Sequence, residues 1–228
     1  PFSHPDFKRS LKQLNGEVLA KRHLLEDPFE YRGIRDYQPQ DDLKSINWKA
    51  TARTGDLKVN QKNYTSQKSV RIFVNLEDTG ILKKEDCVEA CLQIATALLL
   101  LFLEQGMQVA LYCNGIDTIS GDPCILEAGG GVRQRNVCLQ TLARIDTAKP
   151  VQSFSELFAA RMSDASNALY TCFVSPNAYE DFAALLLQYQ EKHLDMKWFY
   201  PYSESTPPDP GEALKSLITF ISLREESV

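Results

Sequence analysis

The sequence lacks several features that would place a protein in a specialised class. It has no run of 18 or more apolar residues, no low-complexity tract and no large excess of one charge, with 25 Lys and Arg against 30 Asp and Glu. These absences argue against a membrane-spanning segment, a disordered chain and a globally basic nucleic-acid binder. What is present is 228 residues with 43% hydrophobic side chains, enough to bury the core of one large domain or two small ones.

Histidine is scarce, and the cysteines form no recognisable ligand or disulfide pattern. The three His residues lie far apart in the sequence. Cys87 and Cys91 are four positions apart on a predicted helix, but two thiols alone do not make a zinc site. Most of the six Cys lie in apolar runs such as 109–113 and 169–174, where a free thiol packs as a small hydrophobic group. We therefore expect unpaired, buried cysteines and a reducing compartment.

Charge divides the chain near residue 69. Residues 1–68 hold 13 basic and 9 acidic side chains, whereas residues 69–228 hold 12 and 21. The first part shows short apolar–polar alternations, as at residues 57–60, that are broken by glycine and proline. We therefore predict a small β-rich N-terminal extension over residues 1–68 and a separate domain over residues 69–228.

The second part alternates apolar strands with helices. Strands are predicted over residues 70–76, 107–113, 168–174, 196–200 and 218–223, and helices over residues 84–105, 132–145, 154–162, 179–193 and 211–217, with turns or a hairpin between residues 114 and 131. Almost continuous apolar strands separated by helices are typical of a mainly parallel sheet with helices on both faces. The predicted fold class is therefore α/β and doubly wound. The very apolar helix over residues 84–105 is expected in its core.

In such a sheet, ligands bind where the chain leaves the carboxyl ends of the strands. The segments to consider are therefore residues 75–80, 114–115, 129–131, 175–177 and 201–203. Residues 129–131 are three glycines before a predicted arginine-bearing helix, so free N–H groups and guanidinium groups could bind phosphate there. No Gly-Lys-Ser/Thr follows, so a flexible connection that lets the helix dock is the alternative.

One stretch of the chain resembles a known family. Residues 29–59 read FEYRGIRDYQPQDDLKSINWKATARTGDLKV. This is similar to the core signature of a bacterial family known as domain of unknown function 58, and the matching positions are Gly33, Ile34, Arg35, Tyr37, Asp41, Ile46, Asn47, Trp48, Ala52 and Arg53. The sequence departs from that signature at Gln40, where the family has Gly, at Asn47, where it has Asp, and in a basic cluster reduced to Lys44.

The resemblance implies a fold, a location and a partner. Members of the family have a C-terminal part that looks like a von Willebrand factor A domain. They carry membrane helices near the N-terminus and are encoded beside MoxR-type AAA+ ATPases. We accordingly expect a von Willebrand A-like domain on the cytoplasmic face of the cell membrane, tethered only through a segment before residue 1, with a MoxR-type ATPase as its partner. The missing initiator Met agrees with such a segment.

The same resemblance implies a Mg²⁺ site that this sequence has largely lost. Von Willebrand A domains hold the ion with Asp-x-Ser-x-Ser after the first strand, a Thr from a Gly-rich loop and an Asp from a third loop. The corresponding residues here are Asn75, Glu77, Thr79, Gly131 and Asn177. We expect these loops to meet at one rim without a metal or other cofactor. The alternative is a ligand-binding or hydrolytic protein that acts at these loops through Glu77, Asp78 and the glycine loop at residues 129–131.

The segment that carries the resemblance also contains candidate docking residues. Arg, Tyr and Trp are enriched at the energetic centres of protein interfaces, and the candidates are Arg35, Tyr37, Asp41, Asp42, Asn47, Trp48 and Arg53. A structural alternative buries Trp48 against the sheet domain and fixes the loop by a bidentate Arg–Asp pair. Charges of both signs alternate here, so nucleic acid is not an expected partner. Because no catalytic constellation is recognisable, we predict a non-catalytic interaction module that serves as an adaptor or scaffold.

Overall fold

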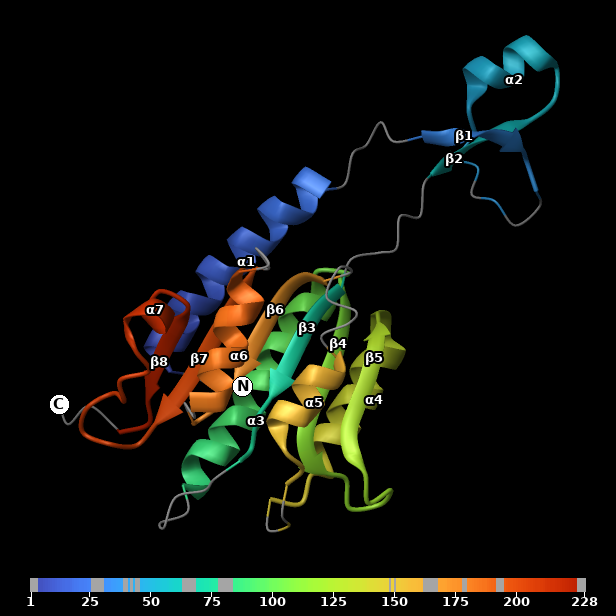
Figure 1. Ribbon diagram of the computed structural model, residues 1–228. Helices are drawn as coiled ribbons and strands as arrows, with labels where there is room; N and C mark the ends of the chain where they lie inside the picture. The colour runs from blue at the N-terminus through green and yellow to red at the C-terminus, as the bar shows by residue number, and fades with distance from the viewer. Residues whose placement is uncertain are drawn as a thin grey trace. The chain divides into compact units, whose positions relative to one another are not determined.

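The computed structural model describes residues 4–25, 31–38, 41, 43, 46–62, 69–77, 84–147, 149, 151–161, 168–177, 180–191 and 195–224 (Figure 1). The chain divides into two compact units, one formed by residues 20–67 and the other by residues 1–19 and 68–228. We call them the small unit and the sheet unit, and each is described by itself.

The sheet unit is built on six strands. Their order across the sheet is β5 (Pro123–Gly129), β4 (Gln108–Ile116), β3 (Ser69–Val74), β6 (Ala168–Val174), β7 (Met196–Tyr202) and β8 (Ile218–Ser222). Neighbouring strands are parallel except β4 and β5, which form an antiparallel hairpin. The sheet is therefore mainly parallel, as predicted, with one reversed strand at its edge.

Helices cover both faces of this sheet. One layer contains α1 (Pro5–Leu25), α3 (Glu85–Glu104) and α4 (Gly131–Ala143), and the other contains α5 (Phe154–Arg161), α6 (Glu180–Glu191) and α7 (Glu212–Lys215) (Figure 1). Each layer encloses its own cluster of buried apolar side chains against the sheet. The sheet unit is thus a doubly wound α/β fold.

Side chains of the central strand β3 alternate between the two apolar clusters, one on each face of the sheet. In β3, Ile72 and Val74 belong to the cluster beneath α3, whereas Phe73 belongs to the other, because successive side chains of a strand point to opposite faces. Phe73 meets Phe158 of α5 edge-to-face, with 5.2 Å between the ring centres. It also stacks on Phe173 of β6 at 5.4 Å. An aromatic layer therefore fixes α5 on the sheet.

α3 is the core helix that the sequence predicted. By length and composition alone it could cross a membrane. Ten of its side chains, however, are buried inside the sheet unit, among them Leu98, Leu99 and Phe102. Packing against the sheet therefore accounts for the apolar composition of this helix.

The first part of the chain differs from the predicted β-rich extension. Residues 5–25 form α1, and residues 1–19 belong to the sheet unit. Phe7, Leu14 and Val18 recur at helical spacing and are buried. The ring of Phe7 lies 5.7 Å from that of Phe199 in β7, centre to centre. Because this apolar stripe covers the sheet, the small unit begins only after residue 19, whereas its other limit, after residue 67, lies close to the predicted boundary near residue 69.

The small unit is a β-hairpin with one short helix. β1 (Tyr31–Asp36) pairs with β2 (Lys58–Lys62) in antiparallel fashion, and α2 (Trp48–Thr54) lies between them in the sequence. Among its described residues, Ile46 and Val59 are the buried apolar side chains, and they pair across an isolated bridge. So small a core leaves much of the shape of this unit to hydrogen bonds and ion pairs.

Candidate functional site

Polar residues gather at the centre of the sheet, where the chain leaves adjacent parallel strands. β3 and β6 are neighbours, but β3 leads to β4 on one side and β6 leads to β7 on the other. Such a switch point is where doubly wound sheets bind ligands. Asn75 follows β3 and Ser175 follows β6, and both are buried, as is Asn114 on β4. The sequence therefore places amide and hydroxyl groups at the edge of the sheet that most often binds ligands.

Asn75 is the centre of a hydrogen-bond network at this edge. Its Oδ1 accepts the backbone N–H of Glu77 at 2.9 Å and the amide N–H of Asn114 at 3.1 Å. Its Nδ2 donates to Ser175 Oγ at 3.2 Å. Both ends of this side chain are thus engaged, so a cation at Oδ1 would compete with two N–H donors.

Asn114 and Ser175 extend the network to two further loops. The Oδ1 of Asn114 accepts the backbone N–H of Leu76 at 2.8 Å, and its Nδ2 also donates to the backbone oxygen of Gln152 at 3.0 Å. Ser175 Oγ accepts the backbone N–H of Asn177 at 3.2 Å and donates to its carbonyl oxygen at 2.9 Å. The side chains of Asn75, Asn114 and Ser175 therefore have neutral hydrogen-bond partners, whereas the buried Nδ2 of Asn177 has none among the described residues.

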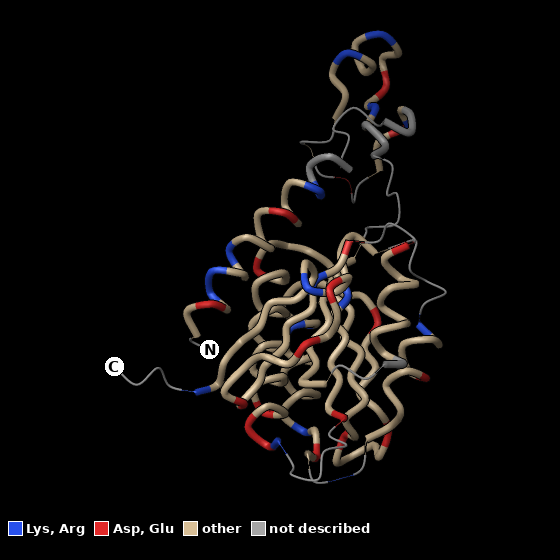
Figure 2. The backbone as a smooth tube through the Cα atoms, turned by 60° about the vertical axis from the view of Figure 1, so that its left-hand side comes forward, with Lys and Arg blue, Asp and Glu red and all other residues tan. Residues whose placement is uncertain are grey.

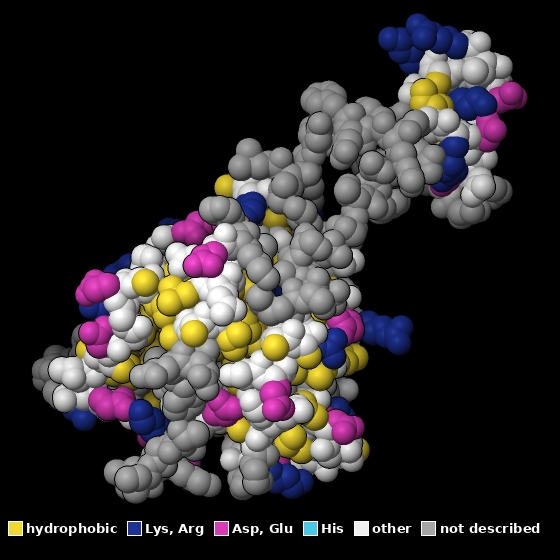
Figure 3. Space-filling view, in the orientation of Figure 1, with side chains coloured by type: hydrophobic (Ala, Val, Ile, Leu, Met, Phe, Trp, Pro, Cys, Tyr) yellow, Lys and Arg dark blue, Asp and Glu magenta, His cyan; other side chains and the backbone are white. Residues whose placement is uncertain are grey.

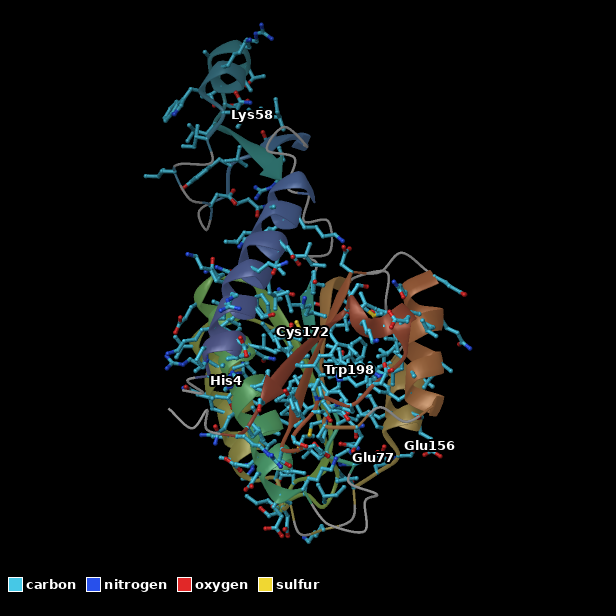
Figure 4. All side chains as sticks on the ribbon, turned by 90° about the vertical axis from the view of Figure 1, so that its left-hand side faces the viewer. His4, Lys58, Glu77, Glu156, Cys172 and Trp198 are labelled. Atoms are coloured by element: carbon cyan, nitrogen blue, oxygen red, sulfur yellow. The ribbon has the colours of Figure 1, made fainter. Side chains whose placement is uncertain are left out.

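Glu77 supplies a carboxylate next to this network and caps a helix. Its Oε1 accepts the backbone N–H of Phe154, the first residue of α5, at 2.7 Å. Figure 4 shows Glu77 at the edge of the sheet unit, whereas Trp198 lies in its interior. A carboxylate at a helix N-terminus interacts favourably with the free N–H groups there. Glu77 thus links the end of β3 to the start of α5.

Only some of the residues predicted for the degenerate metal rim lie together in the structure. Asn75, Glu77 and Asn177 lie at the switch-point edge, and Thr79 lies outside the described residues. Gly131 lies at the opposite end of the sheet. A Cβ atom on the preceding Gly130 would come within 3.7 Å of the carbonyl oxygen of Met107, just before β4 begins.

The position of Gly131 away from the predicted rim follows from the direction of β5. β5 runs antiparallel to β4, so its carboxyl end returns to the amino ends of the parallel strands. The expectation that all three loops share one rim is therefore corrected. The third loop at the switch point is the one before α5, through Gln152, which the sequence reasoning missed because no strand ends there.

Few groups at this edge could hold a metal. Across the part of the chain that the structure describes, no three His, Cys, Asp or Glu side chains converge. The six cysteines are all free and buried, which confirms the expectation of unpaired thiols. Burial raises the pKa of Cys124 and of Cys138 to about 11, so these thiols are not poised to bind soft metals.

A second candidate site lies in the small unit, where an ion pair braces the loop after β1. Both terminal nitrogens of Arg35 donate to the carboxylate of Asp41, at 2.7 and 2.6 Å, and the backbone N–H of Gln38 donates to it at 2.8 Å. These bonds, the Arg35 bond first, lower the pKa of Asp41 to about 2. The bidentate Arg–Asp pair of the structural alternative is therefore present, and it is formed by Arg35 and Asp41.

α2 follows this braced loop and is capped at both ends. Asn47 Oδ1 accepts the backbone N–H of Ala50 at 2.9 Å, and Gly55, with a φ of 82°, ends the helix in the left-handed conformation. Asn is as good an N-cap as the Asp of the family signature. That departure from the signature therefore preserves the helix start.

Trp48 is not buried by the other residues of the small unit, and the alternative that it packs on the sheet unit stays a prediction. Its exposed fraction is 67%, and no residue of α2 is buried. Of the other docking candidates, Arg53 is also exposed and Tyr37 is half-buried, whereas Asp42 lies outside the described residues. Because α2 has no buried face, Trp48 at its start does not contribute to the core of the small unit.

These features define a doubly wound α/β protein with a polar network at its switch point and a small unit that exposes an indole. The chain belongs to the family described as protein of unknown function DUF58, whose family model matches residues 33–168, more than half of the chain. The match begins in β1 and ends at the start of β6, so it includes residues of both units. No curated protein and no solved structure significantly matches the chain.

Proposed function

We propose that this protein is a non-catalytic interaction module, an adaptor or scaffold, in which a von Willebrand A-like sheet unit carries a partner-binding small unit. The observation that carries the proposal is the 67% exposure of Trp48 on a helix with no buried residue. A Trp in water forgoes roughly 2 kcal/mol or more of burial energy. Trp is also among the residues most enriched at interface hot spots.

The switch-point edge supports a non-catalytic function. Asn75 and Asn114 are amides that hold no proton to transfer, and their oxygens accept backbone or side-chain N–H groups. Glu77, a carboxylate next to this network, binds the first N–H of α5. General acid–base catalysis needs a group that changes protonation within reach of a substrate, so this network is better suited to fixing loop geometry.

The location and the partner follow from the family resemblance. We place the protein at the cytoplasmic face of the cell membrane, tethered by a segment outside this chain, with a MoxR-type AAA+ ATPase as the partner. The mainly parallel sheet with a single reversed edge strand supports the von Willebrand A-like assignment.

The experiment measures the affinity of the purified chain for the MoxR-type ATPase encoded beside its gene. We expect Trp48→Ala to weaken binding roughly thirtyfold, as for a hot spot worth about 2 kcal/mol. Ile119→Ala is the matched control, because Ile119 is 75% exposed but lies in the sheet unit. Full affinity in the Trp48 variant, or no binding by the unmodified chain, would contradict the proposal.

A further inference from the structure

Two basic side chains stand beside Trp48 on α2. Lys49 and Arg53 are four residues apart, so they share one face of the helix. Both are exposed, and neither forms an ion pair or side-chain hydrogen bond with another described residue. α2 has no acidic residue in its first turn, and Figure 2 marks its two basic positions in blue. Within the described part of the chain, the two cations of this helix are therefore not paired with a carboxylate.

Two acidic side chains among the described residues of the small unit, Asp41 and Asp36, are engaged elsewhere. Asp41 binds Arg35 through two hydrogen bonds. Asp36 pairs with Lys58, whose pKa is raised mainly by that bond. These two carboxylates are therefore not the partners of Lys49 and Arg53.

Apolar side chains are exposed on the same unit. Of the seven large hydrophobic residues that are exposed in the described parts of the chain, four belong to the small unit: Ile34, Leu43, Trp48 and Leu57. Figure 3 shows apolar side chains in yellow next to basic ones in dark blue on this unit. The small unit, although it has only 48 residues, therefore holds more of these exposed apolar side chains than the sheet unit does.

We propose that α2 binds an acidic segment of a protein partner, whose carboxylates pair with Lys49 and Arg53 while an apolar side chain packs on the indole of Trp48. This inference rests on the proposed function and adds the chemistry of the partner. Carboxylates one helical turn apart match the spacing of the two cations. The apolar contact supplies most of the affinity, and the charges supply selectivity and a faster association.

Protein carboxylates fit this surface better than other anions do. A nucleic acid needs a stripe of cations that neutralises many phosphates, and α2 offers two. An anionic membrane surface is bound firmly only when several cations act together, and α2 offers two.

The test uses two fluorescent peptides and the full chain. One peptide carries two glutamates four positions apart with a leucine between them, and the other has glutamine at both glutamate positions. Fluorescence anisotropy at low and at high salt measures the affinity of each. We expect the chain to bind the glutamate peptide roughly two- to thirtyfold more tightly than the glutamine peptide at low salt, because two exposed ion pairs each add a modest attraction. High salt should remove the difference.

A charge exchange provides the decisive control. The double substitution Lys49→Glu with Arg53→Glu should abolish the preference for glutamate and create one for a matched lysine peptide. Lys8→Glu with Lys12→Glu, an exposed pair with the same spacing on α1, should change neither affinity. Equal affinity of the unmodified chain for the glutamate and glutamine peptides would overturn the inference. So would binding to vesicles of anionic phospholipid without binding to the glutamate peptide.

The outcome can be separated from that of the proposed function. If Trp48→Ala weakens binding to the ATPase and the charge exchange does not alter peptide preference, the interaction module stands and the acidic partner does not. If neither change has an effect, both proposals fail.

Discussion

At the scale of single residues, Asn75 illustrates what an amide does at the end of a strand that a carboxylate could not. It accepts two N–H groups at Oδ1 and donates from Nδ2 to Ser175. An ionised Asp can only accept hydrogen bonds. The amide therefore joins the ends of β3 and β6 without bringing a charge into a fully buried position.

This difference predicts the effect of Asn75→Asp. The new carboxylate loses the bond to Ser175 and is buried without a cationic partner among the described residues, so we expect a loss of about 1–3 kcal/mol in the free energy of unfolding. Urea unfolding followed by circular dichroism measures it. Asp122→Asn, the reverse exchange at an exposed position, should leave the midpoint unchanged. An unchanged midpoint for Asn75→Asp would show that the network does not stabilise the edge.

Asp41 predicts a pH dependence for the small unit. Its pKa is lowered to about 2 in the folded unit, first by the bond to Arg35. A depressed pKa means that the ion pair contributes fully above about 3.9, the value of an unfolded Asp, and that the contribution disappears as the pH falls through about 2. Carbon-detected NMR titration of the carboxyl group should give that value. Arg35→Gln should raise it, whereas Lys58→Gln, which removes the partner of Asp36, should not.

At the scale of elements, the local pattern of apolar and polar residues predicted most strands and helices of the sheet unit. The strands at β3, β6 and β7 and the helix α3 begin and end within a few residues of their predicted limits, because continuous apolar runs and the Gly106 at the end of α3 are strong local signals. The direction of β5 was not predicted. A strand carries the same pattern in either direction, so only its pairing with β4 reveals the reversal that removes Gly131 from the rim.

α1 was missed although its sequence carried a signal. Phe7, Leu11, Leu14 and Val18 recur at spacings of four, three and four, but the intervening polar residues make the segment look like a tail. Such an apolar stripe stabilises a helix mainly when it can pack on another element, here the sheet. In the structure that receiving surface includes Phe199 of β7.

The docking of α1 predicts a large effect from one side chain. Phe7 is 1% exposed and lies against Phe199, so Phe7→Ala should lower the free energy of unfolding of the sheet unit by about 3–5 kcal/mol. Lys12→Ala on the exposed side of the same helix should change it by less than about 0.5 kcal/mol. Thermal and urea unfolding measure both. Equal stability of the two variants would mean that α1 does not contribute to the core.

At the scale of the whole molecule, the boundary predicted from charge can be compared with the two units that contacts define in the structure. The charge break near residue 69 coincides with the end of the small unit, but residues 1–19 join the sheet unit across it. The exposure of Trp48 was equally beyond local reasoning, since an aromatic residue in a sequence looks the same whether it fills a core or faces water.

The free cysteines predict how the whole molecule responds to a thiol reagent. All six are buried, and burial raises the pKa of Cys91, Cys113 and Cys172 in the core of the sheet unit. The thiolate is the reactive form, so we expect no reaction with a chromogenic disulfide reagent in the folded protein and six thiols per chain in denaturant. Rapid reaction of the native chain would mean that the sheet unit opens locally.

The two tryptophans lie in different units, and this gives the molecule a built-in pair of optical reporters. Trp48 faces water in the small unit, while Trp198 is 1% exposed in the sheet unit and donates to the carbonyl oxygen of Ser175. Fluorescence from the buried Trp198 is blue-shifted and therefore reports on the sheet unit. Fluorescence from the exposed Trp48 is quenched by a dissolved ion and therefore reports on the small unit. The loosening of each unit can be observed separately in one unlabelled chain.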